Sequence, residues 1–167
     1  MKSSLTVARK IAIAGMMALV MALSLSLVGC GKSDEEVLKE AISAEFESMK
    51  RLDDKAMAEL QAGTKGADFS QFGMTADDFY KGWLTGFDYN VDGVVVDGNK
   101  ADVSVTLTCK PMAGILEAYS VDGDMAAAMK ATRAETKSIV LPYTKSGNTW
   151  TPGVAYNDEL MKVLMGS

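Results

Sequence analysis

The sequence ADVSVTLTCK at residues 101–110 alternates apolar and polar side chains without a break. Such alternation is typical of a strand whose one face packs on a core while the other meets water. Asp97-Gly98-Asn99 before it has the composition of a tight turn. Phe87–Val96 predicts a preceding strand, and its alternation changes phase at Asp92-Gly93, as at a β-bulge. These residues predict an antiparallel hairpin with one exposed face.

The chain before this hairpin carries helical signals. Ser33-Asp34-Glu35-Glu36 is a capping box, so we expect a helix to begin at Asp34. Asp53-Asp54 suits the start of a second helix, which leaves one long helix or two helices with a bend near Leu52; we favour the bend. Thr75-Ala76-Asp77-Asp78 begins another helix. The apolar positions of these helices are Leu38, Ile42, Phe46, Met49, Leu52, Ala56 and Leu60, then Phe79, Trp83, Leu84 and Phe87.

The chain after the hairpin returns to helix and then to strand. Residues 112–136 have helical character, in two pieces divided by Asp122-Gly123-Asp124. Ser138–Thr144 and Thr149–Thr151 predict a second hairpin, whose Pro142 indicates a sheet edge or a bulge. Asn157-Asp158-Glu159 suits the start of a last helix. The sequence therefore predicts an α+β fold: N-terminal helices on an antiparallel sheet, a helical insertion and a short C-terminal helix.

This order of elements resembles the nuclear-transport-factor-two-like (cystatin-like) cone. The matching parts are the Ser33–Leu60 helices, the Asp97-Gly98-Asn99 hairpin and Gly147-Asn148-Thr149-Trp150, and the resemblance covers most of residues 34–152. It implies a curved sheet that wraps around the long helix and leaves a cavity at its wide end. Residues 112–136 depart from the simplest form and would be an insertion or a cover. The candidate cavity residues that the resemblance implies are Glu45, Trp83, Tyr89 and Tyr119.

Glu45 interrupts the apolar stripe of its helix, because it stands three residues after Ile42 and four before Met49. A buried carboxylate is costly unless it is paired or protonated. Glu45 either reaches water or pairs with a lysine or arginine, or it faces a cavity as a functional carboxylate. Enzymes with the cone fold often use a carboxylate and a tyrosine for proton transfer, and Glu45 with Tyr89 is the pair that the resemblance suggests. Trp83 belongs either to the core or to a ligand site.

The N-terminus has the layout of a secretory signal peptide. Lys2, Arg9 and Lys10 form a basic segment, and Ile11–Val28 is almost wholly apolar. Leu27-Val28-Gly29-Cys30 resembles a bacterial lipobox, in which Leu27, Val28 and Gly29 are recognised by the signal peptidase. The alternative is a retained transmembrane helix, since about 18 apolar residues can span a bilayer. The small Gly29 and the lack of a basic cluster after the apolar run oppose it.

The lipobox resemblance implies a diacylglycerol thioether on the Cys30 sulfur and, commonly, a fatty acyl group such as palmitate on its amine. Residues 1–29 would then be the signal peptide, 30–33 a lipidated tether and 34–167 a single domain. The expected location is the extracytoplasmic side of the cell membrane, with the membrane as a partner through the lipid.

Composition excludes several classes of function. The leader holds three of the 17 basic residues and none of the 22 acidic ones, which leaves the mature chain with a formal charge of −8. Such a domain does not favour nucleic acid as a partner. The chain has no histidine, which excludes Ser-His and Cys-His catalysis and imidazole metal sites. Cys109 has no intrachain partner and is expected to be a buried inert thiol, with a reactive thiol as the alternative.

Known cofactor and metal motifs are incomplete or absent. Residues 88–93 match the first half of a calcium loop, but the twelfth position is Asn99, where that loop needs a bidentate glutamate. We expect no metal and no cofactor. The expected function is a non-enzymatic binding module for a small apolar ligand or an envelope protein; the alternative is a cone-fold enzyme. An open, apolar-lined cone would favour the ligand, and a filled cone with an apolar patch outside would favour the protein.

Overall fold

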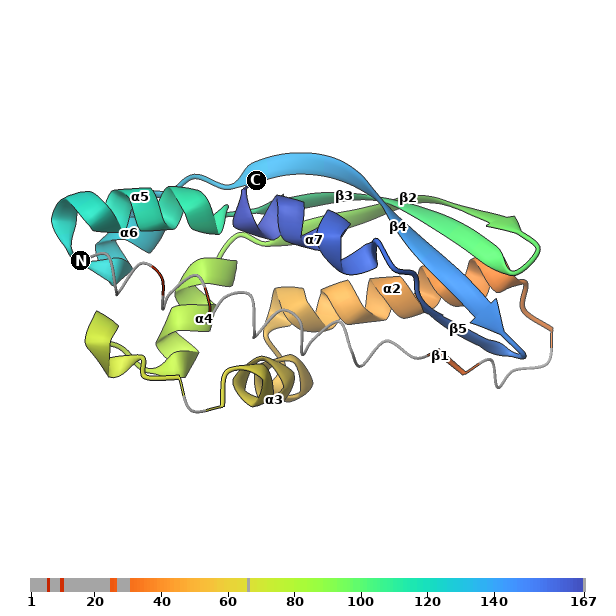
Figure 1. Cartoon of the computed structure of the whole chain (residues 1–167), viewed down its shortest axis with the longest axis horizontal. Helices are drawn as coiled ribbons and strands as arrows, with labels where there is room; N and C mark the ends of the chain where they lie inside the picture. The colour runs from red at the N-terminus through yellow and green to blue at the C-terminus, as the bar shows by residue number, and fades with distance from the viewer. Residues whose placement is uncertain (1–5, 7–9, 11–24, 27–30, 66, 167) are drawn as a thin grey trace.

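The fold is α+β, with helices packed on an antiparallel sheet (Figure 1). The computed structural model describes residues 6, 10, 25–26, 31–65 and 67–166. Its elements are β1 (Leu25–Ser26), α2 (Asp34–Arg51), α3 (Asp54–Gly63), the 3-10 helix η1 (Ser70–Phe72), α4 (Ala76–Leu84), β2 (Asp88–Asp97), β3 (Lys100–Cys109), α5 (Met112–Asp122), α6 (Met125–Ala131), β4 (Glu135–Ser146), β5 (Thr149–Pro152) and α7 (Tyr156–Met165).

The described strands form one sheet in the order β1-β5-β4-β3-β2, and every pairing is antiparallel. The predicted bulge is confirmed, because the β2–β3 register shifts between Val91 and Gly93. Side-chain hydrogen bonds connect neighbouring strands on the exposed face of the sheet: Thr106 Oγ1 of β3 lies 2.7 Å from Asp92 Oδ2 of β2 and 2.9 Å from Ser138 Oγ of β4. The opposite face of β3 is buried at Ala101, Val103, Val105, Leu107 and Cys109. Alternation in the sequence thus predicted which face of β3 is buried.

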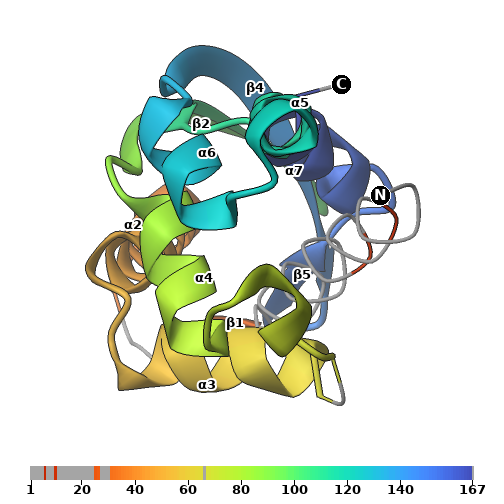
Figure 2. The same ribbon diagram turned by 90° about the vertical axis from the view of Figure 1, so that its left-hand side faces the viewer.

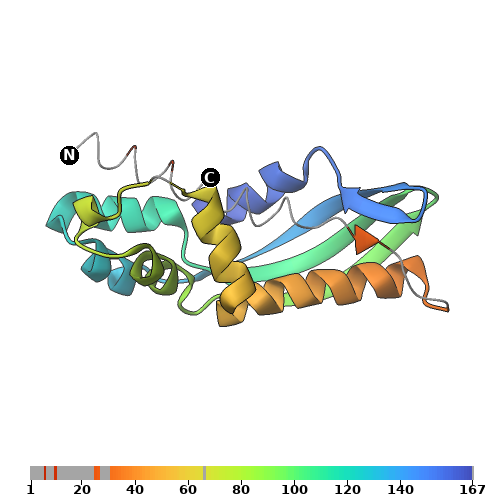
Figure 3. The same cartoon turned by 90° about the horizontal axis from the view of Figure 1, so that it is seen from below.

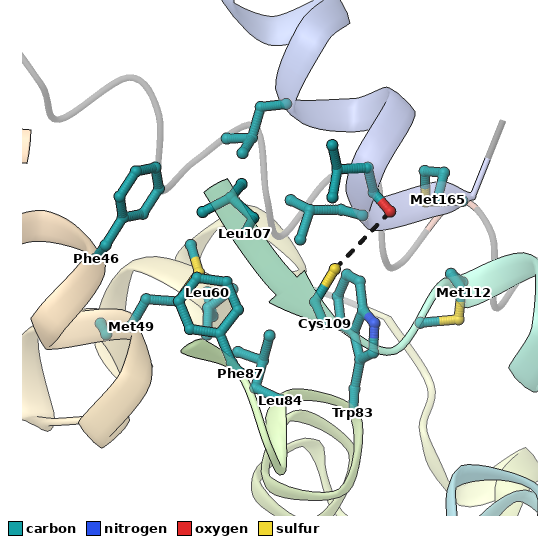
Figure 4. Packing of buried hydrophobic residues seen from close by; sticks show 14 of the residues in the cluster. Phe46, Met49, Leu60, Trp83, Leu84, Phe87, Leu107, Cys109, Met112 and Met165 are labelled. Atoms are coloured by element: carbon teal, nitrogen blue, oxygen red, sulfur yellow. Dashed lines mark hydrogen bonds between the residues drawn. The ribbon is translucent and has the colours of Figure 1, made fainter. Parts of the chain in front are cut away.

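The sheet curves, and α2 and α7 lie against its concave side (Figures 1 and 2). Apolar side chains fill the space between sheet and helices (Figure 4); Leu38, Leu60, Val103, Val105, Leu107 and Leu141 are each 0% exposed. Cys109 is free and buried there, with its sulfur 3.8 Å from the main-chain oxygen of Val163. Burial raises the pKa of the Cys109 thiol to about 11. This confirms a buried thiol.

Local signals placed the helix starts correctly. The Ser33 and Thr75 side chains each accept from the third residue of the helix that follows, and Glu36 and Asp78 bond back to the cap amides. The predicted bend is also confirmed. Leu52 ends α2 in the left-handed conformation, at φ 48°, and α3 turns across the axis of α2 (Figure 3).

Several boundaries differ from the prediction, among them those of β4 and α7. β4 begins at Glu135, so residues 135–136 are strand and not helix; they extend the ladder with β3, where Thr136 pairs with Thr108. The predicted cap at Asn157-Asp158-Glu159 is wrong, because α7 begins at Tyr156 after Ala155 and has no side-chain cap. The Tyr156 ring, at the first position of the helix, packs on Tyr143 with centroids 5.3 Å apart.

Pro142 lies where β4 has a partner on one side only. It pairs with Asp102 of β3, while β5 pairs with β4 only from Tyr143 onward. The Pro142 carbonyl accepts from the amide of Gly153, the residue that follows β5, at 2.8 Å. The proline therefore removes no ladder hydrogen bond, as the edge prediction required.

The lipobox residues 27–30 lie outside the described residues, as do Lys2 and Arg9. Leu25 and Ser26 form β1, where they pair with Trp150 and Thr149 of β5. Within the described part of the chain, no helix combines the length and apolar character needed to cross a bilayer.

Candidate functional site

A cleft of about 810 Å³ lies between α4, the η1 segment and α6. Small-molecule sites in proteins typically have volumes of roughly 300–1,000 Å³, so the cleft is large enough for such a ligand. The side chains and main chain that line it are Phe72, Gly73, Met74, Asp78, Gly82, Thr85, Lys110, Gly123, Asp124, Ala126, Met129 and Lys130. The cleft lies at the helical end of the molecule, where α4, α5 and α6 gather (Figures 1 and 2).

Lys110 holds the two helical walls of the cleft together. Its ammonium donates to the carbonyl of Met129 at 2.6 Å and to that of Gly82 at 3.5 Å. Both carbonyls belong to the last turns of their helices, α6 and α4, where main-chain oxygens lack partners within the helix. The positive charge also suits the negative end of each helix dipole. Lys110 therefore ties α6 to α4 at the end of β3.

Gly82 permits the close approach of these two helices. A Cβ atom at position 82 would lie 2.6 Å from the sulfur of Met129. A side chain there would push Met129 toward the cleft or separate α4 from α6. The glycine inside α4 thus sets the spacing of the walls, at some cost in helix propensity.

The lining combines an apolar part with charged groups. Phe72, Met74, Ala126 and Met129 supply the apolar side chains. Among the charged groups, Asp78 accepts from the Thr75 hydroxyl at 2.7 Å, and this hydrogen bond is the main cause that lowers the pKa of its carboxyl group. The cleft therefore suits a molecule that has both an apolar part and polar or charged substituents.

Two of the four residues predicted to line a cavity lie directly behind the cleft. Trp83 is fully buried, and its indole N–H donates to the carbonyl of Lys110 at 3.0 Å. Tyr119 of α5 is half-buried and packs edge-on against Phe72, with ring centroids 5.8 Å apart. Both residues support lining residues, and neither is itself part of the lining.

Tyr89 lies elsewhere, where β2 packs on α2. Its hydroxyl donates to the Ser43 carbonyl at 2.9 Å and to Glu47 at 3.2 Å, beside a shallow groove of about 330 Å³. Desolvation, and then Glu47, raise the pKa of Tyr89. Residues 45 and 47 are about 200° apart around a helix, so Tyr89 meets a different side of α2 from the one that carries Glu45.

Glu45 is 7% exposed, and one of its carboxylate oxygens lies 3.2 Å from the ammonium of Lys55 in α3. This is the pairing with a lysine that the sequence left open. The structure thus separates the four candidates into three places: Trp83 and Tyr119 behind the cleft, Tyr89 over the outer groove, and Glu45 at the α2–α3 junction.

Sequence reasoning missed Lys110, Met129 and the other lining residues. One signal was available, since a glycine inside an amphipathic helix often marks a close approach of another element. The acidic residues of the partial calcium motif make contacts within the domain: Asp88 forms an ion pair with Lys50 at 2.8 Å, and Asp92 accepts a hydrogen bond from the Thr106 hydroxyl. In the described ranges, no group of three or more acidic or cysteine side chains is arranged to hold a metal.

Comparisons of the chain with protein-family models, with curated proteins and with solved structures found no match.

Proposed function

We propose that this protein is an extracytoplasmic lipoprotein, anchored to the cell membrane through lipid on Cys30, that binds a small, largely apolar molecule without catalysing a reaction. The observation that carries the binding role is the cleft of about 810 Å³ between α4 and α6, whose lining combines apolar side chains with the charged Asp78, Lys110, Asp124 and Lys130. The lipobox-like Leu27-Val28-Gly29-Cys30 carries the anchoring.

The cleft and the proposed lipid anchor lie at opposite ends of the molecule. Only Gly31 and Lys32 separate Cys30 from Ser33, the cap of α2, so the three steps from Cys30 to Ser33 span at most about 11 Å at about 3.6 Å per residue. α2 begins at the end of the molecule where both hairpins turn, and α4, α5 and α6 lie at the opposite end (Figure 1). The cleft therefore faces away from the anchored end.

Ligand binding is favoured over an envelope-protein contact by the described surface. The large apolar side chains that are exposed there are four valines: Val95 of β2 and Val140 of β4 share the open face of the sheet on strands separated by β3, and Val121 of α5 and Val154 before α7 lie outside the sheet. A docking face for a protein usually has a contiguous apolar patch of several hundred square ångströms. The alternative of a cone-fold enzyme loses its suggested pair, because Glu45 and Tyr89 contact different partners.

Native mass spectrometry of the full chain, purified from its membrane in detergent, tests the binding role. We expect a co-purified small molecule at one copy per chain. Ala126→Trp should abolish this adduct, because Ala126 is exposed and lines the cleft, so the indole ring fills the space without disturbing the core. Ala127→Trp, an exposed neighbour outside the lining, is the control and should keep the adduct. An adduct that survives Ala126→Trp, or none in the wild-type protein, would contradict the proposal.

A further inference from the structure

The charged residues that line the α4–α6 cleft differ in how deeply they are buried. The exposed ones are Asp78, Asp124 and Lys130. Lys110 is half-buried, and its ammonium lies 2.6 Å from the carbonyl oxygen of Met129 and 3.5 Å from that of Gly82. Because Met129 and Gly82 also line the cleft, the ammonium lies at its inner wall. The least exposed charge in the cleft is therefore positive.

The Lys110 ammonium has no carboxylate partner. In the part of the chain that the structure describes, none of the ion pairs includes Lys110. The two carbonyl groups accept from it but carry no net charge, and an ammonium has three N–H donors, so one donor is left for a ligand. A charge that is partly withdrawn from water is costly unless it is paired. An anionic ligand would supply the missing counter-ion.

The two carboxylates of the lining already have partners within the protein. Asp78 Oδ2 accepts from the amide of Thr75 at 3.4 Å and from its hydroxyl at 2.7 Å. Asp124 Oδ1 accepts from the amide of Ala127 at 3.0 Å. Each carboxylate also lies at the N-terminal end of a helix, where the helix dipole favours negative charge. Both are exposed to water as well, so neither needs a cationic ligand.

Apolar side chains lie beside the Lys110 ammonium. Met129, whose carbonyl accepts from Lys110, is 2% exposed, and Phe72 is 8% exposed. Both residues line the cleft. A ligand whose anionic group contacts Lys110 can therefore bury an apolar part against the same walls.

We propose that the cleft selects an apolar molecule that carries a carboxylate, and that the Lys110 ammonium binds this carboxylate. The inference rests on the ligand-binding function proposed above and adds the charge of the ligand. The formal charge of −8 on the mature chain repels anions at long range. Salt screens this repulsion beyond about 8 Å at physiological ionic strength, so the local charge of Lys110 determines the preference.

Isothermal titration of the full chain in detergent with benzoate, benzamide and benzamidine tests this inference. The three molecules have nearly the same size and shape, and they are anionic, neutral and cationic at pH 7. We expect benzoate to bind with a Kd on the order of millimolar, because so few non-hydrogen atoms give limited binding energy. Benzamide should bind about tenfold more weakly, because it lacks the charge-assisted hydrogen bond, and benzamidine should bind more weakly still.

Variants locate the interaction. Lys110→Met should bind benzoate no more tightly than benzamide, and its benzamide affinity reports whether the cleft is intact. Ala126→Trp should abolish benzoate binding, because Ala126 lines the cleft. Lys81→Met removes an exposed lysine of α4 that lies outside the lining, and it is the matched control that should keep the wild-type preference.

The inference would be overturned by benzamide or benzamidine binding as tightly as benzoate, or by the absence of benzoate binding up to about 20 mM. It would also be overturned by a preference for benzoate that persists in Lys110→Met, or by benzoate binding that persists in Ala126→Trp. The co-purified adduct and its loss in Ala126→Trp report on the ligand site whatever the charge of the ligand. An adduct without a preference for benzoate would therefore refute this inference and leave the proposed function intact.

Discussion

The ammonium of Lys145 lies 2.8 and 2.7 Å from the two carboxylate oxygens of Asp34, a residue 111 positions earlier in the chain. Trp150 Nε1 donates to the same carboxylate at 3.2 Å. Asp34 is the first residue of α2, and Lys145 lies near the turn between β4 and β5. This contact fixes the start of the long helix to the second hairpin, at the end of the molecule that carries the proposed anchor.

Asp34→Asn should therefore destabilise the fold. The Asp34 and Lys145 side chains are 28% and 22% exposed, and hydrogen bonds to such partly buried charges contribute about 1.5–3 kcal/mol. We expect a loss of about 1–2 kcal/mol in the free energy of unfolding, measured by urea titration at pH 7. Glu40→Gln, which breaks the exposed pair with Lys32, should change it by less than about 0.5 kcal/mol.

The contribution of Asp34 should depend on pH in one direction. The hydrogen bond from Lys145 is the main cause that lowers the pKa of Asp34 from its ordinary value of 3.8. A lowered pKa gives stability that is present above 3.8 and lost as the pH falls through the folded-state value. The difference between wild type and Asp34→Asn should then shrink below pH 3.8. A difference that stays constant down to the acid transition would contradict this assignment.

Lys110→Met should loosen the helical end of the molecule. It removes a charged donor from the terminal carbonyls of α4 and α6, and we expect a loss of about 2 kcal/mol in the free energy of unfolding. Hydrogen exchange should show faster opening of α6. Lys130→Met removes an exposed ammonium from the same cleft and should stay within about 0.5 kcal/mol of wild type. Equal effects of the two variants would show that the bonds of Lys110 add nothing.

Gly82→Val tests whether the glycine sets the spacing of α4 and α6. The first added carbon already meets the Met129 sulfur at 2.6 Å, so overpacking should cost about 1–3 kcal/mol and displace the co-purified ligand. Gly93→Ala is the control, because a Cβ at position 93 meets nothing within 4 Å. A thermal unfolding curve for each variant gives the comparison; wild-type stability in Gly82→Val would refute the spacing role.

Cys109 should not react with thiol reagents in the folded protein. With a thiol pKa of about 11, only about one molecule in a thousand is ionised at pH 8, and the sulfur is buried. Dithionitrobenzoate should therefore modify no thiol in the native protein. In guanidinium it should modify one thiol per chain, since the Cys30 sulfur is expected to be a thioether. Rapid labelling under native conditions would favour the reactive-thiol alternative.

Local patterns in the sequence predicted much of the fold. The Ser33 and Thr75 capping boxes depend on residues three apart, and the alternation at 101–110 needs only one strand, so neighbouring residues carry the information. The predicted start of α7 was wrong because that helix begins without a side-chain cap, at Tyr156, whose ring packs on Tyr143 of a separate element. Short-range signals cannot report such a contact.

The candidate site was harder to predict for the same reason. Lys110 acts through carbonyls 28 and 19 positions away, and a lysine at the end of a strand gives no sign of such partners. Glu45 could be identified because it interrupts an apolar stripe, but its partner could not: the resemblance suggested Tyr89, and the structure pairs Glu45 with Lys55 of α3. The position of a side chain on its own helix is predictable, and what it contacts depends on how the other elements pack.

We propose that this domain works from a membrane surface to which lipid on Cys30 attaches it. The decisive experiment is mass spectrometry of the N-terminal peptide, from protein isolated out of the membrane fraction of its own cells. We expect a peptide that begins at Cys30 and carries a diacylglycerol group, with Cys30→Ala abolishing both the cleavage and the added mass. A peptide that begins at Met1 and contains an unmodified Cys30 thiol would contradict it.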